Sequence, residues 1–363
     1  MARNLIYAAL GEEAERGIKE SGTVGFLPLL SPVVPKSEFD DRKRKEWRGE
    51  EAALGPRAVE RFSERWSASL DMPFFTEASP AKGMVGTLLK HFFGKSASGQ
   101  NGSTGQYYHM MCPAADPFSE SLLGHKALTL NFNINEGANV RNWPFVGGRV
   151  KALTFEQEAG QALKLSAEIF GQRRDADTVE LGSPVFAAEN LRCDYNNLSI
   201  STGLISRTGT APDFTGFSAA GATAIRPDKV SIKVENGMED ALRLSGAAYP
   251  DRTRMGEFKV SVELVIDWED PSNGFSSIAE FREWVSGAGT TNLFFHWDTC
   301  TTAGTGGTHG LIIDLPRLHR TGGEPEYSRE KDPMVTLKYE GLFDGAEARY
   351  MMGLMLINTA PTV

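Results

Sequence analysis

The sequence predicts a mainly β protein of the α+β class, built from two tandem β-sandwich domains with one flanking helix each. Its 363 residues include 38 glycines and 18 prolines, which supply the many turns that short strands need. A charged loop, a long alternating strand, a short amphipathic helix and several further strands occur in this order twice. A polar segment lies between the two copies, so we expect domains at residues 1–180 and 190–363.

Composition and charge exclude several classes of protein. The net charge is −9, with 47 acidic and 38 basic residues, whereas a protein that binds nucleic acid through its phosphates carries a basic excess. The longest apolar run, 351–357, is far shorter than the roughly 20 residues of a membrane span, and residues 1–13 do not have the pattern of a signal peptide. The three cysteines are far apart in sequence and are expected to be buried free thiols. We therefore expect a protein that folds in the cytosol and has no membrane partner.

The first copy begins with an apolar, proline-limited segment at 23–30 and a long charged loop at 36–57. The strand after this loop, 59–70, places Phe62, Trp66 and Leu70 on its apolar face. Ser79-Pro80 and Gly94 are start and stop signals for a helix at 79–93. Further strands are expected at 107–112 and 127–135, followed by a hairpin of 150–157 with 161–170.

The second copy follows the same order. Its long loop is expected at 236–256, and its helix at 276–286 has an apolar stripe that includes Trp284 and Val285. The chain is predicted to end in a hairpin of 335–339 with 350–357. The remaining strands are expected near 198–205, 230–235, 257–267, 292–297 and 311–315.

Several stretches resemble the tail tube (major tail) proteins of long-tailed, non-contractile bacteriophages. Leu10-Gly-Glu-Glu13, Gly22-Thr23 and Phe26-Leu-Pro-Leu29 are similar to the opening of that family. Leu128-Thr-Leu-Asn-Phe132 and the segment 145–155 are similar to its most recognisable block, although Lys151-Ala152 replaces the usual Asn-Ser. The last strand, which closes on Leu356-Ile-Asn358, also fits.

The resemblance implies tail-tube-like domains whose edge strands join those of neighbouring subunits into an intersubunit β-barrel around a channel. The expected partners are further copies of the chain, in stacked rings of three copies with pseudo-sixfold symmetry or, alternatively, of six. The tape measure, terminator and distal tail proteins are the other expected partners. DNA is expected to pass through the lumen without specific binding, in a virion assembled in the host cytoplasm.

Two groups of residues are candidates for assembly. Long loops that reach the adjacent ring are expected to carry Asp40, Arg42, Lys43, Arg44, Lys45, Trp47, Arg48, Arg252 and Arg254. Carboxylates that line the lumen and repel DNA are expected to be Glu156, Glu158, Glu168, Glu263, Asp267 and Glu340, although each could equally be an ordinary surface residue.

The alternatives are another tail ring component, such as a terminator or distal tail protein, and a sugar-binding or sugar-hydrolysing β-sandwich. Asp267 and Glu269 would suit hydrolysis, but their spacing selects no pair. None of the six histidines has metal-ligand spacing, and the glycine-rich segment 304–310 lacks the lysine of a phosphate-binding loop. We therefore expect no catalytic residue, no metal and no cofactor.

Overall fold

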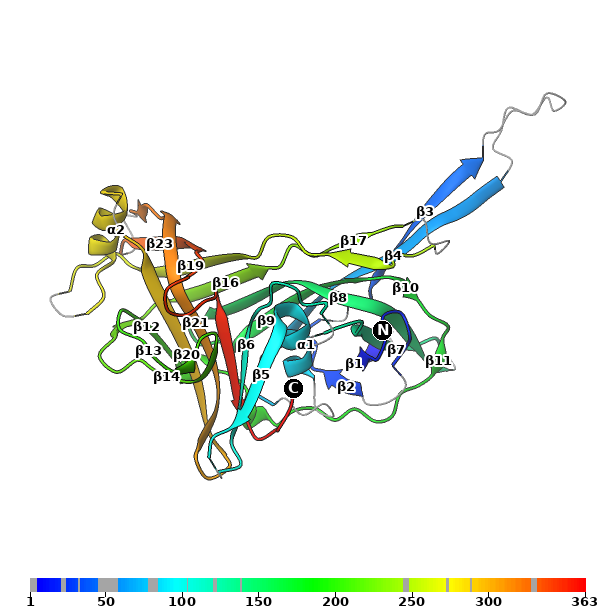
Figure 1. Cartoon of the computed structure of the whole chain (residues 1–363), viewed down its shortest axis with the longest axis horizontal. Helices are drawn as coiled ribbons and strands as arrows, with labels where there is room; N and C mark the ends of the chain where they lie inside the picture. Colours follow the sequence, from blue (N-terminus) through cyan, green and yellow to red (C-terminus); the bar gives the residue numbers. More distant parts are fainter. Residues whose placement is uncertain are drawn as a thin grey trace.

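The structure, a computed structural model, is made of antiparallel strands and two short α-helices among the residues it describes (Figure 1). The predicted mainly β class is therefore confirmed. The helices are α1 (Val85–Phe93) and α2 (Ser277–Val285), which fall within the predicted ranges 79–93 and 276–286, although α1 begins at Val85 and the predicted start at Ser79-Pro80 lies outside the described residues. The described residues are 5–20, 24–31, 33–44, 58–77, 84–102, 104–119, 123–137, 139–243, 248–271, 274–287, 289–327 and 332–363.

One sheet, called the main sheet here, runs through both halves of the chain. Its strand order is β3-β4-β9-β8-β16-β19-β23, and β23 also pairs with the end of β21 and with β22. The junction between the halves in this sheet is the antiparallel pairing of β8 with β16, and a second junction pairs β24 of the second half with β6 of the first. The strands are β3 (Lys36–Arg44), β4 (Ala58–Pro73), β8 (Val140–Glu158), β9 (Lys164–Gly171), β16 (Lys229–Glu235), β19 (Lys259–Asp267), β21 (Gly307–Gly322), β22 (Pro325–Glu326) and β23 (Met334–Gly341).

A second layer of strands covers the main sheet in each half. In the first half its order is β2-β1-β7-β8, with β10 and β11 on the far side of β8. Over the second half its order is β15-β12-β20-β21-β24-β6-β5, in which β6 and β5 come from the first half of the chain. The strands are β1 (Leu5–Glu13), β2 (Val24–Leu27), β5 (Gly94–Gln100), β6 (Tyr107–Pro113), β7 (Ala127–Asn135), β10 (Arg173–Arg174), β11 (Thr178–Val179), β12 (Leu198–Thr202), β15 (Thr223–Ile225), β20 (Thr291–Ala303) and β24 (Gly353–Asn358).

The long strands β8 and β21 each belong to both layers. The first part of β8 pairs with β7 and its last part pairs with β9, while β21 pairs in the same way with β20 and then with β23. A strand that changes sheet in this way makes the corner of a β-sandwich. A register shift marks both corners, between Leu128 and Leu130 in the first half and between Thr291 and Leu293 in the second.

The strand pairings of the first half recur in the second half in the same chain order. Strands β1, β2, β3, β4, β7, β8 and β9 correspond in turn to β12, β15, β16, β19, β20, β21 and β23. With this correspondence, each of the six pairings β1·β2, β1·β7, β3·β4, β4·β9, β7·β8 and β8·β9 has an equivalent in the second half. One hydrophobic cluster nevertheless includes buried residues of both halves, such as Leu10 and Leu356. The division at 1–180 and 190–363 stays a prediction.

One of the two predicted hairpins is wrong. The strands of 150–157 and 161–170 do pair, as β8 with β9. The strands of 335–339 and 350–357 do not pair with each other, because β23 lies between β19 and β21 in the main sheet and β24 lies between β21 and β6 in the second layer. The intervening loop carries the chain from one layer to the other, which a local turn signal does not reveal.

The two helices differ in burial. All but one residue of α1 is buried, whereas only Ser277 of α2 is buried. Phe258, from the second half, packs against Phe92 and Phe93 of α1 with ring centroids 5.9 Å and 6.2 Å apart. Val285 of α2, which the sequence placed on a core-facing stripe, is 65% exposed. That expectation is wrong for Val285, because helical periodicity identifies an apolar face but not the element that covers it.

Two further hairpins are attached to the sandwich, β13 (Ser206–Thr210) with β14 (Asp213–Ser218) and β17 (Glu239–Ala241) with β18 (Arg252–Arg254). Arg207 connects the first of them to β21: its Nε donates to Asp314 Oδ2 at 2.8 Å, and one terminal nitrogen donates to Oδ1 at 3.0 Å. The Tyr350 hydroxyl donates to Asp314 Oδ2 at 2.5 Å. Short 3-10 turns at Glu189–Leu191 and Tyr195–Asn197 join the two halves.

We expect the variant Arg207→Leu to lose about 3 kcal/mol of unfolding free energy, because it leaves the charge of Asp314 buried with one partner fewer. Asp314 is 0% exposed. The measurement is urea denaturation. Lys229→Leu is the matched control, since it breaks the exposed ion pair with Glu158 and should cost less than about 1 kcal/mol. Equal losses in the two variants would contradict the expectation.

Candidate assembly surfaces

All six predicted lumen carboxylates lie on one face of the main sheet. Residues directly opposite each other in antiparallel strands share a face, and the registers connect Glu156 to Ser231, Ser231 to Glu263 and Glu263 to Lys338. Parallel rows across the sheet contain the other carboxylates, Glu158, Glu168, Asp267 and Glu340. The alternate residues of the same strands, such as Val262 and Leu337, are buried in the core. These strands therefore have one charged face and one buried face, and the lumen-lining role of the carboxylates stays a prediction.

Lysines that the sequence analysis did not select lie among these carboxylates. Lys164 Nζ lies 3.5 Å from Glu156, Lys229 Nζ lies 2.6 Å from Glu158, and Lys338 Nζ lies 3.4 Å from Glu263. The row through Glu156 and Glu263 thus places Lys164 next to Glu156 and Lys338 next to Glu263. The face carries paired charges of both signs rather than carboxylates alone. Cross-strand partners could have been found in the sequence only if the strand order had been known.

The pKa shifts on this face follow from the same pairs. The hydrogen bond from Lys229 to Glu158 raises the pKa of Lys229. The hydrogen bond between Lys233 and Glu235 raises the pKa of the lysine and lowers that of the carboxyl. Each shift favours the charged form, so the face keeps its paired charges at neutral pH.

The prediction of a loop over 36–57 is wrong for its first part, because residues 36–44 form strand β3, and residues 45–57 lie outside the described residues. Strands β3 and β4 pair from Lys36 opposite Ser67 to Arg44 opposite Ala58, and together they project from the body of the molecule (Figure 1). Asp40 is exposed on β3. The backbone of Arg42, Lys43 and Arg44 continues that strand. Lys45, Trp47 and Arg48 lie outside the described residues. The contacts predicted for this loop stay a prediction.

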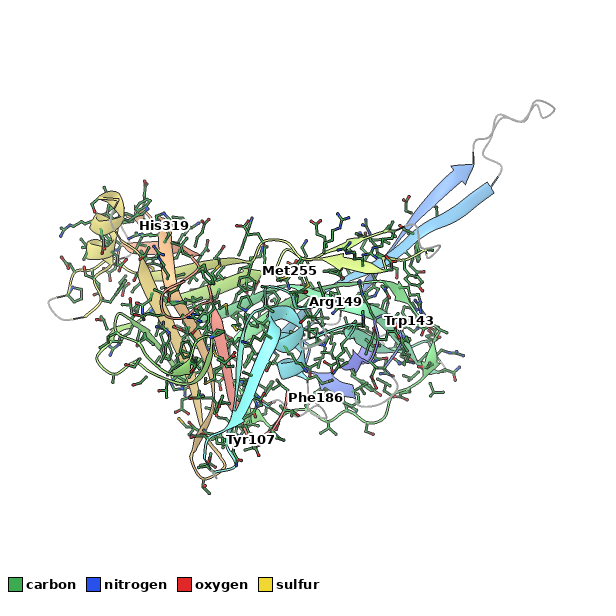
Figure 2. The ribbon with its side chains drawn as sticks, in the orientation of Figure 1. Tyr107, Trp143, Arg149, Phe186, Met255 and His319 are labelled. Carbon is green, nitrogen blue, oxygen red and sulfur yellow. The ribbon has the colours of Figure 1, made fainter. Side chains whose placement is uncertain are left out.

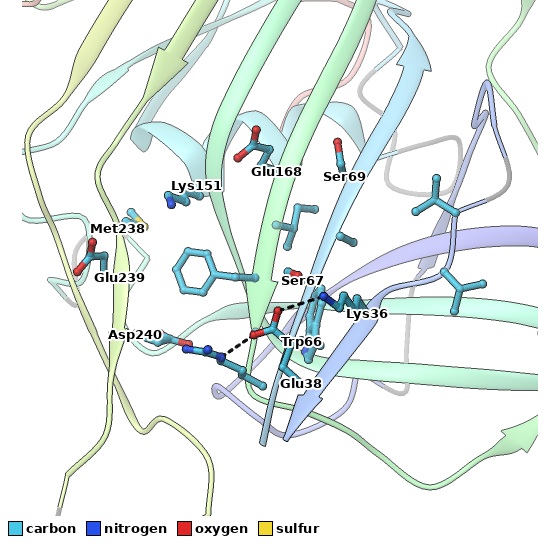
Figure 3. A pocket seen from close by; sticks show the side chains of 17 residues that line it. Lys36, Glu38, Trp66, Ser67, Ser69, Lys151, Glu168, Met238, Glu239 and Asp240 are labelled. Atoms are coloured by element: carbon cyan, nitrogen blue, oxygen red, sulfur yellow. Dashed lines mark hydrogen bonds and ion pairs between the residues drawn. The ribbon is translucent and has the colours of Figure 1, made fainter. Parts of the chain in front are cut away.

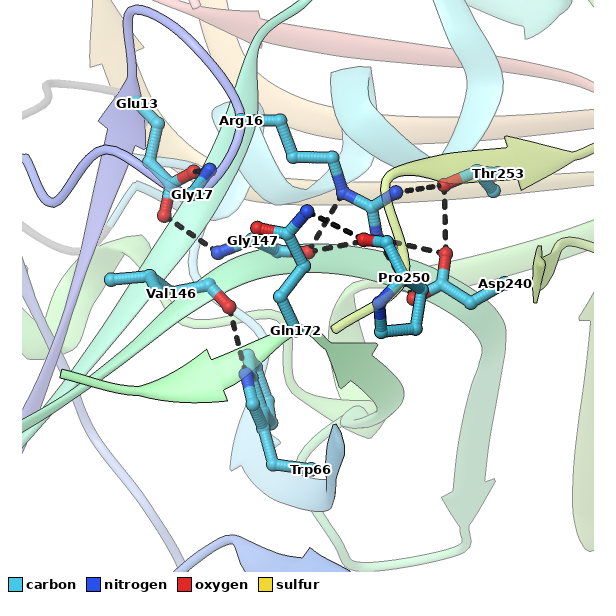
Figure 4. A network of polar contacts seen from close by, with 10 residues as sticks. All are labelled: Glu13, Arg16, Gly17, Trp66, Val146, Gly147, Gln172, Asp240, Pro250 and Thr253. Carbon is cyan, nitrogen blue, oxygen red and sulfur yellow. Dashed lines mark hydrogen bonds and ion pairs between the residues drawn. The ribbon is translucent and has the colours of Figure 1, made fainter. Parts of the chain in front are cut away.

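The second predicted loop, 236–256, contains the β17–β18 hairpin, which packs against the first half of the chain (Figure 4). Arg16 donates to both oxygens of Asp240 at 2.8 Å and to Thr253 Oγ1 at 2.7 Å. Gln172 Nε2 donates to the carbonyl of Pro250 at 2.6 Å, and the amide of Glu64 donates to the carbonyl of Ala248 at 2.7 Å. The loop therefore connects the two halves.

Arg252 and Arg254, the predicted inter-ring residues of that loop, are on β18 and remain exposed. Met255, which follows them, lies near the middle of the long axis of the molecule (Figure 2). Beneath the hairpin, Glu13 accepts hydrogen bonds from the amides of Gly17 and Gly147 at 2.7 Å and 2.8 Å. Burial of Arg149 nearby lowers its pKa to about 9. Sequence reasoning did not select this network, because its members are far apart along the chain.

A surface cavity of about 680 Å³ opens on the charged face (Figure 3). Its lining includes Ser67, Lys151 and Glu168 of the sheet together with Lys36 and Asp240. The cavity therefore lies between the base of the β3–β4 hairpin and the β17–β18 hairpin, next to one of the predicted lumen residues. Its wall is part of the sheet surface, and it is not an enclosed cleft.

The histidines and cysteines of the described residues form no metal site, since no group of three or more His, Cys, Asp or Glu side chains is arranged to hold an ion there. Cys112 and Cys193 are buried, as predicted, but Cys300 is exposed, which corrects that expectation. Within the described residues, no helix has the length and apolar character of a membrane span.

His91 of α1 is fully buried and lies 3.0 Å from Glu12 Oε1. Burial lowers the pKa of His91 to about 4. Burial also opposes the charge of Glu12, but hydrogen bonds from His91 and Lys126 outweigh it and hold the pKa of that carboxyl well below its usual range. The neutral histidine and ionised glutamate connect α1 to β1.

We expect the unfolding free energy to fall as the pH drops from about 6.5 to 4. The pKa of His91 is lower in the folded than in the unfolded chain. Its contribution to the unfolding free energy is therefore fully present above the pKa of the unfolded chain, about 6.5, and is lost as the pH falls towards the folded pKa. Urea midpoints at a series of pH values measure this dependence. His91→Gln should weaken it, and an unchanged slope in that variant would contradict the assignment.

A comparison with known protein families identifies the family of the chain that carries these surfaces. The sequence profile described as "phage tail tube protein" matches residues 7–341, which is nearly the whole chain and includes both the charged face and the two hairpins. None of the curated proteins matches the chain. The family is one of structural virion components that assemble with one another and with other tail proteins. On this match, the chain belongs to the phage tail tube protein family.

Proposed function

We propose that the protein polymerises into stacked rings that form the hollow tail tube of a phage, through which DNA passes during ejection. The observation that carries this proposal is the β8–β16 pairing, which continues one sheet from the first half of the chain into the second. A sheet that extends in this way and has an edge at each end is suited to continue into further copies. The family membership supports the same function.

The ring is proposed to contain three copies. Each copy would supply two tube units, 1–180 and 190–363, and the recurrence of strand pairings supports this division. Three copies would then give a ring of six similar units, with six copies as the alternative. Head-to-tail contacts of this kind close into a ring when the rotation allows it, and stacked rings grow into a tube.

The charged face of the main sheet is proposed to line the lumen. Its lysines offset carboxylates such as Glu158 and Glu263, so we no longer attribute passage of DNA to a purely acidic wall. A lysine already paired with a carboxylate presents less uncompensated positive charge to a phosphate. The face would therefore let DNA slide without holding it.

The β3–β4 hairpin is proposed to contact the next ring, because it projects from the body. The tape measure, terminator and distal tail proteins are the proposed partners at the ends and inside of the tube. Assembly is proposed to occur in the cytoplasm of the host cell.

Negative-stain microscopy of the purified protein tests the function. Long hollow tubes are expected, on their own or after nucleation by a tail tip. Single closed rings that never stack would instead indicate a terminator or distal tail protein. A monomer that binds glycans and forms neither rings nor tubes would overturn the proposal in favour of a sugar-binding sandwich.

A further inference from the structure

We infer that the edge formed by residues 320–326 of one subunit pairs with β3 of a second copy, in a register set by the β8–β16 junction inside the chain. This inference rests on the proposed function and names the strands, residues and register of the contact between neighbouring subunits. The β8–β16 junction would then be an internal version of that contact.

Neither edge of the main sheet has a further strand beside it in the described part of the chain, although the Arg320 guanidinium donates to the carbonyls of Gly322 and Gly323 at the second edge. Among the described residues, β3 pairs only with β4, and β22 pairs only with β23. Residues 319–322 of β21 also pair only with β23. Exposed edges of this kind are templates for pairing with another chain. They carry exposed apolar side chains too, since Val34 beside β3 is 40% exposed and Tyr327 beside β22 is 73% exposed.

The end of β8 corresponds residue by residue to the end of β21 and β22. In the first half, Val150 lies opposite Ile169 and Phe155 opposite Leu165, with a register shift between Val150 and Ala152. In the second half, the equivalent pairs are Arg320 with Tyr339 and Pro325 with Val335, with a shift between Arg320 and Gly322. The shared shift fixes the alignment: Ala152, Thr154 and Glu156 correspond to Gly322, Glu324 and Glu326.

Strand β3 corresponds in the same way to β16. Lys36 lies opposite Ser67 and Glu38 opposite Arg65, while Lys233 lies opposite Ser261 and Glu235 opposite Lys259. Both strands therefore have the sequence Lys-x-Glu at equivalent positions in the sheet. Both also form the ion pair between those side chains, at 3.9 Å in β3 and 2.6 Å in β16.

The internal junction places Thr154 opposite Lys233 and Ala152 opposite Glu235. Applied to the free edges, this register places Glu324 opposite Lys36 of the second copy and Gly322 opposite its Glu38. Glu324 is exposed, and so is Lys36. Opposite charges directly across a strand pair stabilise it. The predicted contact would place the carboxylate of Glu324 opposite Lys36, where the internal junction has the uncharged Thr154 opposite Lys233.

The helices support the same arrangement. At the internal junction, Asn236, which follows β16, donates to the carbonyl of Phe92 in α1 at 3.2 Å. Asn236 corresponds to Phe39 of β3, and α1 corresponds to α2. The register therefore brings Phe39 of the second copy, which is 44% exposed, towards α2 and its exposed Val285. Contact with a second copy would give α2 the cover that α1 obtains within the chain.

A disulfide experiment tests the register. Cys300, the exposed thiol, is first replaced by serine, and the double variant Glu324→Cys with Lys36→Cys is assembled and oxidised. Non-reducing gels should show dimers and trimers in high yield, because the two positions lie at opposite edges of one subunit and join only between copies. In the control Glu324→Cys with Val34→Cys, the second cysteine lies two residues before Lys36, just outside β3, and should cross-link at least several-fold less.

Charge exchange gives an independent measurement. Glu324→Lys should reduce assembly, measured by sedimentation and micrographs, and addition of Lys36→Glu should restore it. If the unmodified protein forms tubes but the predicted cysteines do not cross-link, or cross-link no better than the displaced control, this register is overturned while the tube function stands. If the unmodified protein forms neither rings nor tubes, both proposals fail.

Discussion

Deletion of residues 40–51 is expected to leave the protein folded and soluble but to abolish tube growth. The deleted segment includes Asp40–Arg44, the end of β3 on a hairpin that projects from the body, and its remaining residues lie outside the described residues. The core below this segment, with Trp66 and Leu70 buried on β4, is retained. Circular dichroism and urea denaturation should therefore resemble those of the unmodified protein, whereas micrographs should contain no tubes.

A replacement of residues 40–51 by a glycine-serine segment of equal length is the matched control. It keeps the connection between the strands but removes the charged and aromatic side chains, including Asp40 and Trp47. Loss of tubes in both variants would assign ring-to-ring contact to those side chains. Normal tubes from the deletion would contradict the role of this loop, and the residues of the proposed subunit edge, Lys36 and Glu38, would still be present.

Replacement of Trp66 by alanine is expected to lower the unfolding free energy by about 3–5 kcal/mol. Trp66 is 1% exposed and packs edge-on against Phe145 with ring centroids 5.7 Å apart. Its indole nitrogen donates to the carbonyl of Val146 at 2.8 Å (Figure 4). That carbonyl also accepts from the amide of Gln172 at 3.1 Å, so the loss comes mostly from packing.

The space for Trp66 depends on Gly171. A Cβ at Gly171 would lie 2.4 Å from the indole ring, closer than atoms pack, so Gly171→Ala is expected to cost about 1–3 kcal/mol. In the Trp66→Ala background the same change should be nearly neutral, because the ring is gone. Urea denaturation of the two single variants and the double variant completes the cycle. Equal costs of Gly171→Ala in both backgrounds would contradict this account.

The sequence by itself determined the class of fold and the polarity of its strands. Alternation in 257–267 fixed which of its residues face the core, because successive side chains of a strand point to opposite faces. The helices and the β8–β9 hairpin could be predicted because each depends on local signals, whereas the common face of the six carboxylates also depends on strand order and register. The family resemblance and the profile match agree with that reading.

Only the tertiary structure decided which strands are neighbours and what covers each surface. The lysines that pair with Glu158 and Glu263 come from other strands, and local sequence carries no information about strand order. The same limit explains the wrong hairpin at 335–357 and the exposure of Val285. The pairing of β8 with β16, and the register that it suggests for a second copy, exist only once both halves are folded against each other.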